Sequence, residues 1–167
     1  MKKITVLLLI LPLLLCACSH KRDEDSGTAQ PSYIDADPSD VIDRVYGMLS
    51  DGTATSDYIP QLITEKITEK NDEYYLGISG IPYTKGAASE AYIQPVTFSF
   101  CVIVLEEGAD YDSCRKTIEQ NLNRSKWVCA AAEEAIAVRH ANVIAVIMGT
   151  KKVCAELEGA FLDVVSK

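Results

Sequence analysis

Nucleophilic catalysis in this chain would rest on a single histidine. His20 lies in a polar N-terminal stretch, which leaves His140 as the candidate base of a Ser-His-Asp or Cys-His mechanism. His140 lies between two apolar runs, which predicts a hairpin turn where a solvated imidazole is the ordinary case. The sequence contains no phosphate-binding glycine loop, no HExxH and no GxSxG. We therefore predict no catalytic residue.

Cysteines are the next candidates, as metal ligands or as disulfides. Cys101, Cys114, Cys129 and Cys154 form no CxxC pair. Because zinc sites are typically built from such close pairs, we predict no metal site and no cofactor. Cys101, Cys114 and Cys154 fall on apolar faces and Cys129 starts a segment expected to be buried, so we expect free, buried thiols. Two disulfides are the alternative, because an exported protein meets an oxidising environment.

Adjacent carboxylates offer the acid and base groups of a hydrolase. Glu106–Glu107 and Glu133–Glu134 are two such pairs, and both are expected at strand ends. Solvated turns account for acidic residues at these positions without catalysis. An envelope hydrolase using paired carboxylates is the alternative function, and it requires these side chains to converge in one concave pocket. Scattered positions would favour a binding protein.

The segment Gly149–Lys152 is a candidate anion site. Two lysines follow Thr150 at a predicted helix start, where backbone N–H groups can also bind an anion. Lysines ordinarily favour the other end of a helix, so their position is informative. Ordinary capping of the helix by Thr150 is nevertheless the favoured interpretation.

Aromatic residues are the remaining candidates, as parts of a binding surface. They fall near predicted loops and element ends rather than inside apolar stripes, and they are Tyr74, Tyr75, Tyr83, Tyr92 and Trp127. Such positions suit a groove or patch that binds a small molecule or a partner protein. The alternative is that these rings close the rim of the core with their polar tips in water. We take Tyr75, Tyr83, Tyr92 and Trp127 as the candidate binding residues.

Composition limits the class of partner. The 167 residues carry 24 acidic and 16 basic side chains, a net charge of −8. Nucleic acid is not an expected partner, because phosphate binding needs clustered Lys and Arg. With 48% hydrophobic residues the chain is expected to fold around one core.

The N-terminus predicts export and a lipid anchor. The basic start Met1–Lys3 precedes an apolar run, Ile4–Leu15, that is too short to span a membrane. Leu15–Cys18 then resembles a bacterial lipobox, with Cys18 as the first mature residue and a signal peptide at 1–17. Acyl chains on Cys18 would hold the protein at the outer face of the cytoplasmic membrane.

Hydrophobic periodicity predicts a single domain at 39–167, after a flexible polar tether at 18–38. Helices are expected from Ser39 or Asp40 to Gly52, from about Gln61, from a cap at Thr68 through Asn71 to Leu76, from Asp110 to Leu122 and from Thr150 to Val165. Strands are expected at Ile93–Leu105, Ala135–Val138 and Val143–Met148, with a loop at Ser79–Gly86.

This order of elements predicts an α+β fold. N-terminal helices precede a β-α-β-β-α unit that forms a small, mostly antiparallel sheet with helices packed on one face. In its first strand, Phe98, Phe100 and Val102 are expected to be buried. His140 or Asn142 is expected to take the positive φ of the hairpin turn.

Several stretches resemble a family of uncharacterised lipoproteins of Gram-positive bacteria, the domain of unknown function 4358 family. The resemblance is carried by the lipobox and polar tether, by Asn71–Ile78, by Lys126–Cys129 and by the strand pair with Met148 near its end. It spans roughly residues 40 to 165. The resemblance implies a location and a fold, and no catalytic residue.

Together these patterns favour a membrane-anchored extracytoplasmic lipoprotein that is not an enzyme. Its expected role is to bind an envelope protein or a small ligand, because exposed aromatic residues and a tether suit recognition. The expected partners are the membrane, through lipid on Cys18, and that unknown protein or ligand.

Overall fold

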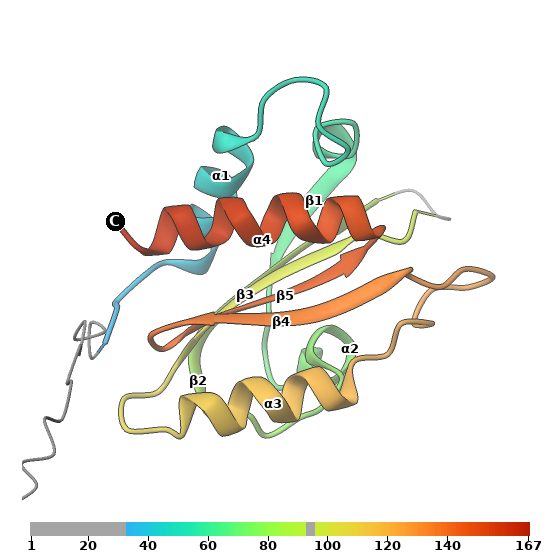
Figure 1. The fold of residues 1–167 in the computed structure, drawn as a ribbon. Helices are drawn as coiled ribbons and strands as arrows, with labels where there is room; N and C mark the ends of the chain where they lie inside the picture. The colour runs from blue at the N-terminus through green and yellow to red at the C-terminus, as the bar shows by residue number, and fades with distance from the viewer. Residues whose placement is uncertain (1–32, 93–95) are drawn as a thin grey trace, which may run out of the picture.

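A computed structural model describes residues 33–92 and 96–167 of the chain. Five strands form one sheet in the order β1-β2-β3-β5-β4, and every neighbouring pair is antiparallel. The strands are β1 Leu62–Lys66, β2 Tyr83–Ala91, β3 Ser99–Leu105, β4 Glu134–His140 and β5 Val143–Gly149. The helices are α1 Pro38–Met48, the 3₁₀ turn η1 Ile59–Gln61, α2 Asp72–Leu76, α3 Tyr111–Asn121 and α4 Lys151–Val165. The α+β class and the antiparallel sheet are confirmed (Figure 1).

Helices cover both faces of the sheet, which corrects the expectation that they pack on one face. Figure 1 shows α1 and α4 above the sheet and α2 and α3 below it. The α1/α4 face buries Phe100, and the α2/α3 face buries the neighbouring Cys101. Successive side chains of a strand point to opposite faces, so both faces of a strand that is apolar throughout need a cover.

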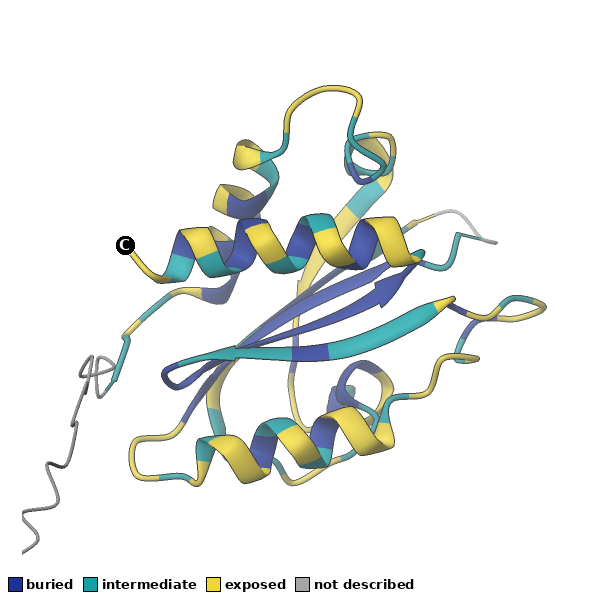
Figure 2. Ribbon diagram, in the orientation of Figure 1, coloured by how far each residue is buried: buried dark blue, intermediate teal, exposed yellow. Residues whose placement is uncertain are grey.

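The centre of the sheet is made by β3 and β5, the two strands whose residues are all buried (Figure 2). Phe98, Phe100 and Val102 are 0–1% exposed, which confirms their expected burial. The strands β1 and β4 lie at the two edges of the sheet and are more exposed. The end of the sheet where β3 begins is called the Ser99 end below, and the opposite end the Leu105 end.

Two strands lie where the sequence predicted a helix and a loop. The helix expected from Gln61 is instead η1 followed by β1, because Leu62–Lys66 pairs with β2. The loop expected at Ser79–Gly86 ends at Pro82, and β2 follows it. Small residues lower the strand propensity of β2, but Gly86 is required there. A Cβ on Gly86 would lie 2.9 Å from the Cβ of Ile67.

The α-helices begin after short polar residues, but two of the caps differ from those expected. The residue before α2 is Asn71 rather than Thr68. Asp37 caps α1, rather than Ser39 or Asp40, because Pro38 occupies the first helical position. Asp110 and Thr150 cap α3 and α4 as predicted, each accepting a backbone N–H of the first turn. None of the helices in the described residues is long and apolar enough to cross a membrane.

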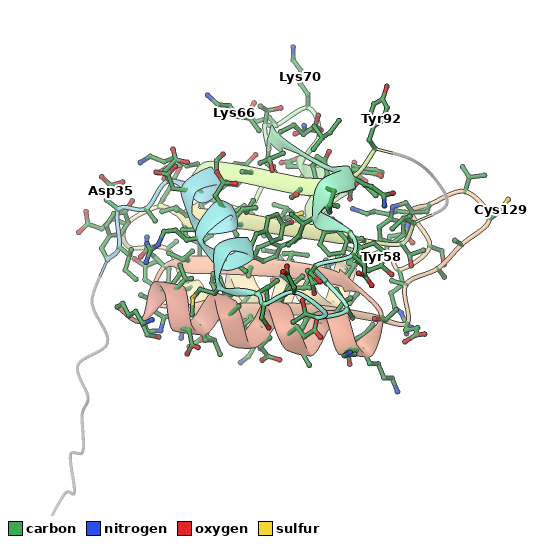
Figure 3. The ribbon with its side chains drawn as sticks, turned by 90° about the horizontal axis from the view of Figure 1, so that it is seen from above. Asp35, Tyr58, Lys66, Lys70, Tyr92 and Cys129 are labelled. Atoms are coloured by element: carbon green, nitrogen blue, oxygen red, sulfur yellow. The ribbon has the colours of Figure 1, made fainter. Side chains whose placement is uncertain are left out.

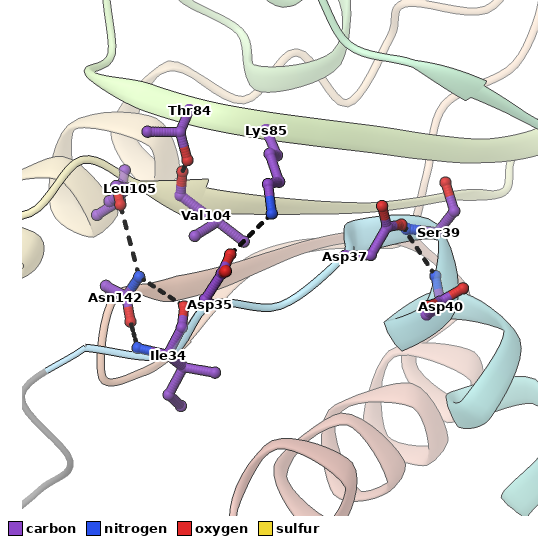
Figure 4. A network of polar contacts seen from close by, with 10 residues as sticks. All are labelled: Ile34, Asp35, Asp37, Ser39, Asp40, Thr84, Lys85, Val104, Leu105 and Asn142. Atoms are coloured by element: carbon purple, nitrogen blue, oxygen red, sulfur yellow. Dashed lines mark hydrogen bonds and ion pairs between the residues drawn. The ribbon is translucent and has the colours of Figure 1, made fainter.

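The folded structure begins before residue 39, which corrects the tether boundary. The N–H of Ile34 donates to Asn142 Oδ1 at 2.6 Å, and Asn142 Nδ2 donates to the Ile34 carbonyl at 3.1 Å (Figure 4). Asn142 is fully buried, so these bonds anchor the segment that enters α1.

In the hairpin turn Ala141, rather than His140 or Asn142, takes the positive φ, of 50°. The predicted signal peptide, Cys18 and the tether up to residue 32 lie outside the described residues.

Candidate functional site

The most unusual side chain in the described structure is a buried lysine at the Ser99 end of the sheet. Lys126 lies between α3 and β4, and its side chain is 3% exposed. Its ammonium forms an ion pair with Glu90 at the end of β2 and donates to Ser99 Oγ at 3.1 Å. Moving a charged group out of water is costly unless a partner is close by, and Glu90 supplies the opposite charge.

Three aromatic rings surround the same ammonium. Lys126 Nζ lies 4.4 Å from the ring centroid of Tyr74, 5.1 Å from that of Tyr75 and 5.0 Å from that of Trp127. Tyr75 and Trp127 are 6% and 5% exposed. An ammonium at such distances is attracted by the negative faces of the rings. Glu65, Tyr74, Tyr75, Glu90, Ser99, Lys126 and Trp127 are called the Lys126 corner below.

Hydrogen bonds fix the two tyrosines of the corner. Tyr74 donates its hydroxyl hydrogen to Glu90 Oε2 at 3.1 Å, and Tyr75 donates to Glu65 on β1. Burial and the Glu90 carboxylate raise the pKa of Tyr74 to about 12. Burial and the bond to Glu65 raise the pKa of Tyr75 as well. Both phenols are therefore hydrogen-bond donors at neutral pH.

The two side chains of the corner region that could act as nucleophiles are Ser99 and Cys101, and neither is activated. A lysine ammonium has three donors and no lone pair, so in this state Lys126 cannot take a proton from Ser99. Ser99 and the adjacent Cys101 are both fully buried. Burial raises the pKa of the Cys101 thiol to about 12, against the opposing effect of Lys126. Neither side chain is an activated nucleophile.

Clefts lie on either side of the two tyrosines. One, of about 410 Å³, is lined by Tyr74 and Lys126 together with Lys70, Asn71, Glu73, Gly77 and Asn123. The other, of about 300 Å³, is lined by Ile63, Glu65, Tyr75, Glu90, Ala91 and Tyr92. Tyr92 is 77% exposed, and Figure 3 shows its ring projecting from the molecule. The corner is thus accessible from two sides.

The structure brings some of the predicted aromatic residues together, and their role in binding stays a prediction. Tyr75 and Trp127 meet at Lys126, and Tyr92 lies at the rim of the second cleft. Tyr83 lies elsewhere, in a larger cleft of about 610 Å³ that the buried carboxylate of Asp72 also lines. Tyr83 is at the opposite end of β2, paired with Leu105, which is why it does not join the others.

Sequence reasoning missed the charged members of the corner, which are Lys126, Glu90 and Glu65. Lys126 precedes Trp127, and this adjacency was the available signal for it. Glu90 and Glu65 carried no such signal, because β1 was predicted as a helix and the part of β2 that holds Glu90 was assigned to no strand. The cluster depends on pairing between strands that are distant in sequence.

The two carboxylate pairs do not converge. Glu106 follows the last residue of β3, at the Leu105 end, whereas Glu134 opposes Gly149 at the Ser99 end. β3 lies between these ends, and its seven residues span about 20 Å at the usual strand rise. Glu133 has a structural role, because its Oε2 accepts the N–H of Lys151 at 3.2 Å at the start of α4. The geometry that a paired-carboxylate hydrolase requires is absent for these four residues.

That same contact bears on the candidate anion site at Gly149–Lys152. The start of α4 already binds a carboxylate from within the chain, that of Glu133, and Thr150 Oγ1 caps Val153 N at 3.2 Å. Capping by Thr150, the favoured interpretation, is confirmed.

His140 is the last residue of β4, beside the turn, and it is half-buried.

The four cysteines of the described residues are free thiols, as expected. Cys101, Cys114 and Cys154 are buried, and burial raises the pKa of each thiol. Cys129 is exposed, so its expected burial is wrong. It lies at the tip of a turn closed by a bridge between Trp127 and Ala130, with a positive φ of 66°.

No protein-family model matches this chain, and no curated protein or solved structure is significantly similar to it. The resemblance to a lipoprotein family therefore stays a prediction. Two of the runs that carry the resemblance, Asn71–Ile78 and Lys126–Cys129, supply Tyr74, Tyr75, Lys126 and Trp127 to the corner.

Proposed function

We propose that this protein is an exported lipoprotein, held at the outer face of the cytoplasmic membrane by lipid on Cys18, and that it acts as a non-enzymatic binding module. Its ligand is an envelope protein or a small molecule. The Lys126 corner and the clefts beside it form the binding surface. The observation that carries this assignment is the burial of the Lys126 ammonium among three aromatic rings beside those clefts.

The physical argument rests on preorganisation. Ordering aromatic and charged side chains costs conformational entropy, and a protein that has already ordered them does not lose it again on binding. Lys126, Glu90 and the two tyrosines are held by contacts to one another before any ligand arrives. Aromatic residues in concave sites supply large contact area, and a few fixed polar groups supply orientation.

The alternative, an envelope hydrolase using paired carboxylates, has less support. Its candidate carboxylates, Glu106–Glu107 and Glu133–Glu134, lie at opposite ends of the sheet. Within the described residues, no group of three or more His, Cys, Asp or Glu side chains is placed to hold a metal ion. Binding is therefore the better-supported class.

The anchor is tested by detergent phase partitioning of two matched variants. Cys18→Ser removes the proposed acceptor of the lipid, so the protein should lose its partitioning into the detergent phase. Cys16→Ser changes the neighbouring cysteine of the same segment and should leave partitioning intact. If Cys18→Ser protein is still cleaved after Ala17 and partitions as the unaltered protein does, the lipoprotein assignment is wrong.

The binding surface is tested by photocrosslinking in native membranes. A photoreactive amino acid replaces Tyr92, at the rim of the second cleft, or Met48, a 44% exposed residue of α1 that serves as the control. We expect a discrete crosslinked species from position 92 and not from position 48. Loss of that species in a second variant, Tyr74→Ala, would tie it to the corner. Equal crosslinking from both positions would contradict the assignment.

A further inference from the structure

We infer that the cleft beside Glu65 takes the cationic side chain of a basic peptide that lies along the outer edge of β1. This inference rests on the proposed binding function and specifies its ligand. The cleft is lined by two carboxylates, Glu65 and Glu90, by the rings of Tyr75 and Tyr92, and by aliphatic side chains. Neither Lys nor Arg is among the residues that line it.

The charges of the corner leave one carboxylate without a cation. Lys126 forms its ion pair with Glu90. Glu65 accepts a hydrogen bond from Tyr75, a neutral phenol, and it belongs to none of the ion pairs found in the described residues. The corner therefore keeps a net negative charge on the side that faces the cleft, and an added ammonium or guanidinium would balance it.

Lys126 shows how this surface binds a cation. Its ammonium contacts Tyr75 at 5.1 Å from the ring centroid and a carboxylate on β2. The cleft presents Tyr75 again, the exposed ring of Tyr92 and the second carboxylate, Glu65. Aromatic faces beside a carboxylate are the chemistry that recognises lysine and arginine side chains.

The backbone of β1 supplies a reason for a peptide rather than a small amine. Tyr92 N–H donates to the Gln61 carbonyl at 3.0 Å, and Ile67 N–H donates to the Gly86 carbonyl at 2.9 Å. In an antiparallel ladder, bonded and outward-facing residues alternate. Leu62, Thr64 and Lys66 therefore direct their N–H and C=O groups away from the sheet.

Those outward groups are open to a partner strand in the described structure. β1 is the first strand in the sheet order, and β2 is the strand it pairs with. The Lys66 carbonyl already accepts a hydrogen bond from Asn71 Nδ2 at 3.0 Å. The backbone N–H and C=O groups of Leu62 and Thr64 are the ones left for a partner strand. The opposite edge differs, because the Ala137 carbonyl of β4 accepts from Arg115. A peptide paired with β1 would place alternate side chains beside Ile63 and Glu65.

The test is the affinity of the full-length protein in detergent for a short fluorescent peptide of alternating Thr and Lys. We compare Glu65→Gln with Glu107→Gln, which makes the same charge change at an exposed residue of the Leu105 end. In Glu65→Gln the side-chain amide still offers a carbonyl oxygen to Tyr75, so the fold is preserved, and a thermal melt verifies this. We expect Glu65→Gln to raise the dissociation constant about fivefold, and Glu107→Gln to leave it unchanged.

Two altered peptides separate charge from strand pairing. Acetylation of every lysine removes the positive charge and should abolish binding. Methylation of alternate backbone nitrogens removes the donors that pair with β1 and should weaken binding about tenfold. Equal losses in Glu65→Gln and Glu107→Gln, undiminished binding of the acetylated peptide, or undiminished binding of the methylated peptide would each overturn the inference. If position 92 crosslinks a partner in membranes while the Lys peptide does not bind, the inference fails and the proposed function stands.

Discussion

The two faces of the sheet are both covered by a pair of helices, but they bury different kinds of side chain. The α1/α4 face packs Phe98, Phe100 and Phe161, each 0–1% exposed, against aliphatic residues. The α2/α3 face is also apolar over most of its area, but at the Ser99 end it contains the charged Lys126 and Glu90. One face is built to exclude water, and the other is built to hold a charge at its margin.

The difference teaches where stability and function reside in this fold. Apolar packing on the α1/α4 face stabilises the domain in proportion to the area it removes from water. A buried ion pair adds little net stability, because desolvation offsets its attraction, but it fixes the positions of the groups around it. The Lys126 corner thus contributes little to the free energy of folding, but it is a preformed surface beside open clefts.

The largest expected effect comes from the α1/α4 face. Phe100→Ala removes a fully buried ring that lies 5.9 Å from the ring of Tyr46, between centroids. It should lower the free energy of unfolding by about 3 to 5 kcal/mol, through lost transfer energy and a cavity. Denaturant unfolding measures this, with Val128→Ala, at a 79% exposed position, as the control. An unchanged midpoint for Phe100→Ala would show that this ring faces solvent.

The next effect tests whether the charge pair behaves as a buried one. Lys126→Met leaves Glu90 without its cation, at 16% side-chain exposure, and should cost about 3 kcal/mol. Adding Glu90→Gln should recover most of this loss. The control Lys152→Met breaks a contact to Glu156 at 70% lysine exposure and should cost less than about 1 kcal/mol. Similar losses in the two lysine variants would show that Lys126 is solvated.

A smaller effect is expected at a buried polar group whose partners are backbone atoms. Asn142→Ala removes the two bonds to Ile34 and should cost about 1 to 3 kcal/mol. Hydrogen exchange of the Ile34 amide should quicken, because its acceptor is gone. Peptide binding at the Ser99 end should not change. Unaltered exchange at Ile34 would contradict the anchoring of this segment by Asn142.

The smallest effect is a titration rather than a loss of stability. The pKa of Tyr74 is raised from 10.0 to about 12, so in alkali its phenol keeps its proton in the folded chain after it is lost from the unfolded one. The resulting stabilisation is complete below pH 10.0 and is lost as the pH rises through about 12. Ultraviolet titration of the folded protein against Tyr74→Phe should show one phenol ionising near pH 12. If the phenol that Tyr74→Phe lacks is instead one that ionises near pH 10, Tyr74 is exposed to water.

The fold was predictable where the pattern of side chains is continuous. The apolar run of β5 and the capped helices α3 and α4 were expected at nearly their observed positions. The end of β3 at Leu105 was also expected, but the strand begins at Ser99 rather than at Ile93. β1 and β2 were not expected, because an exposed edge strand and a strand rich in Gly, Ala and Ser lack an apolar pattern. The second covered face was missed for a related reason, since α2 and α3 pack there through few residues.

The candidate site was predictable through its aromatic residues and not through its charges. These aromatic residues could be singled out because they fall near predicted loops and element ends rather than inside apolar stripes; they are Tyr75, Tyr92 and Trp127. Glu65 and Glu90 look like ordinary surface carboxylates in sequence, and their role appears when β1 pairs with β2. The local pattern of apolar residues does not show which distant strands pair.

The central claim is that the Lys126 ammonium is held out of water between three aromatic rings. Nitrogen-15 NMR of the side-chain ammonium groups tests it directly, with Lys126→Arg to assign the signal. We predict a slowly exchanging ammonium signal for Lys126, with neighbouring methylene protons shifted upfield by the rings of Tyr74, Tyr75 and Trp127. Rapid exchange and the chemical shifts of a solvated lysine would contradict the account.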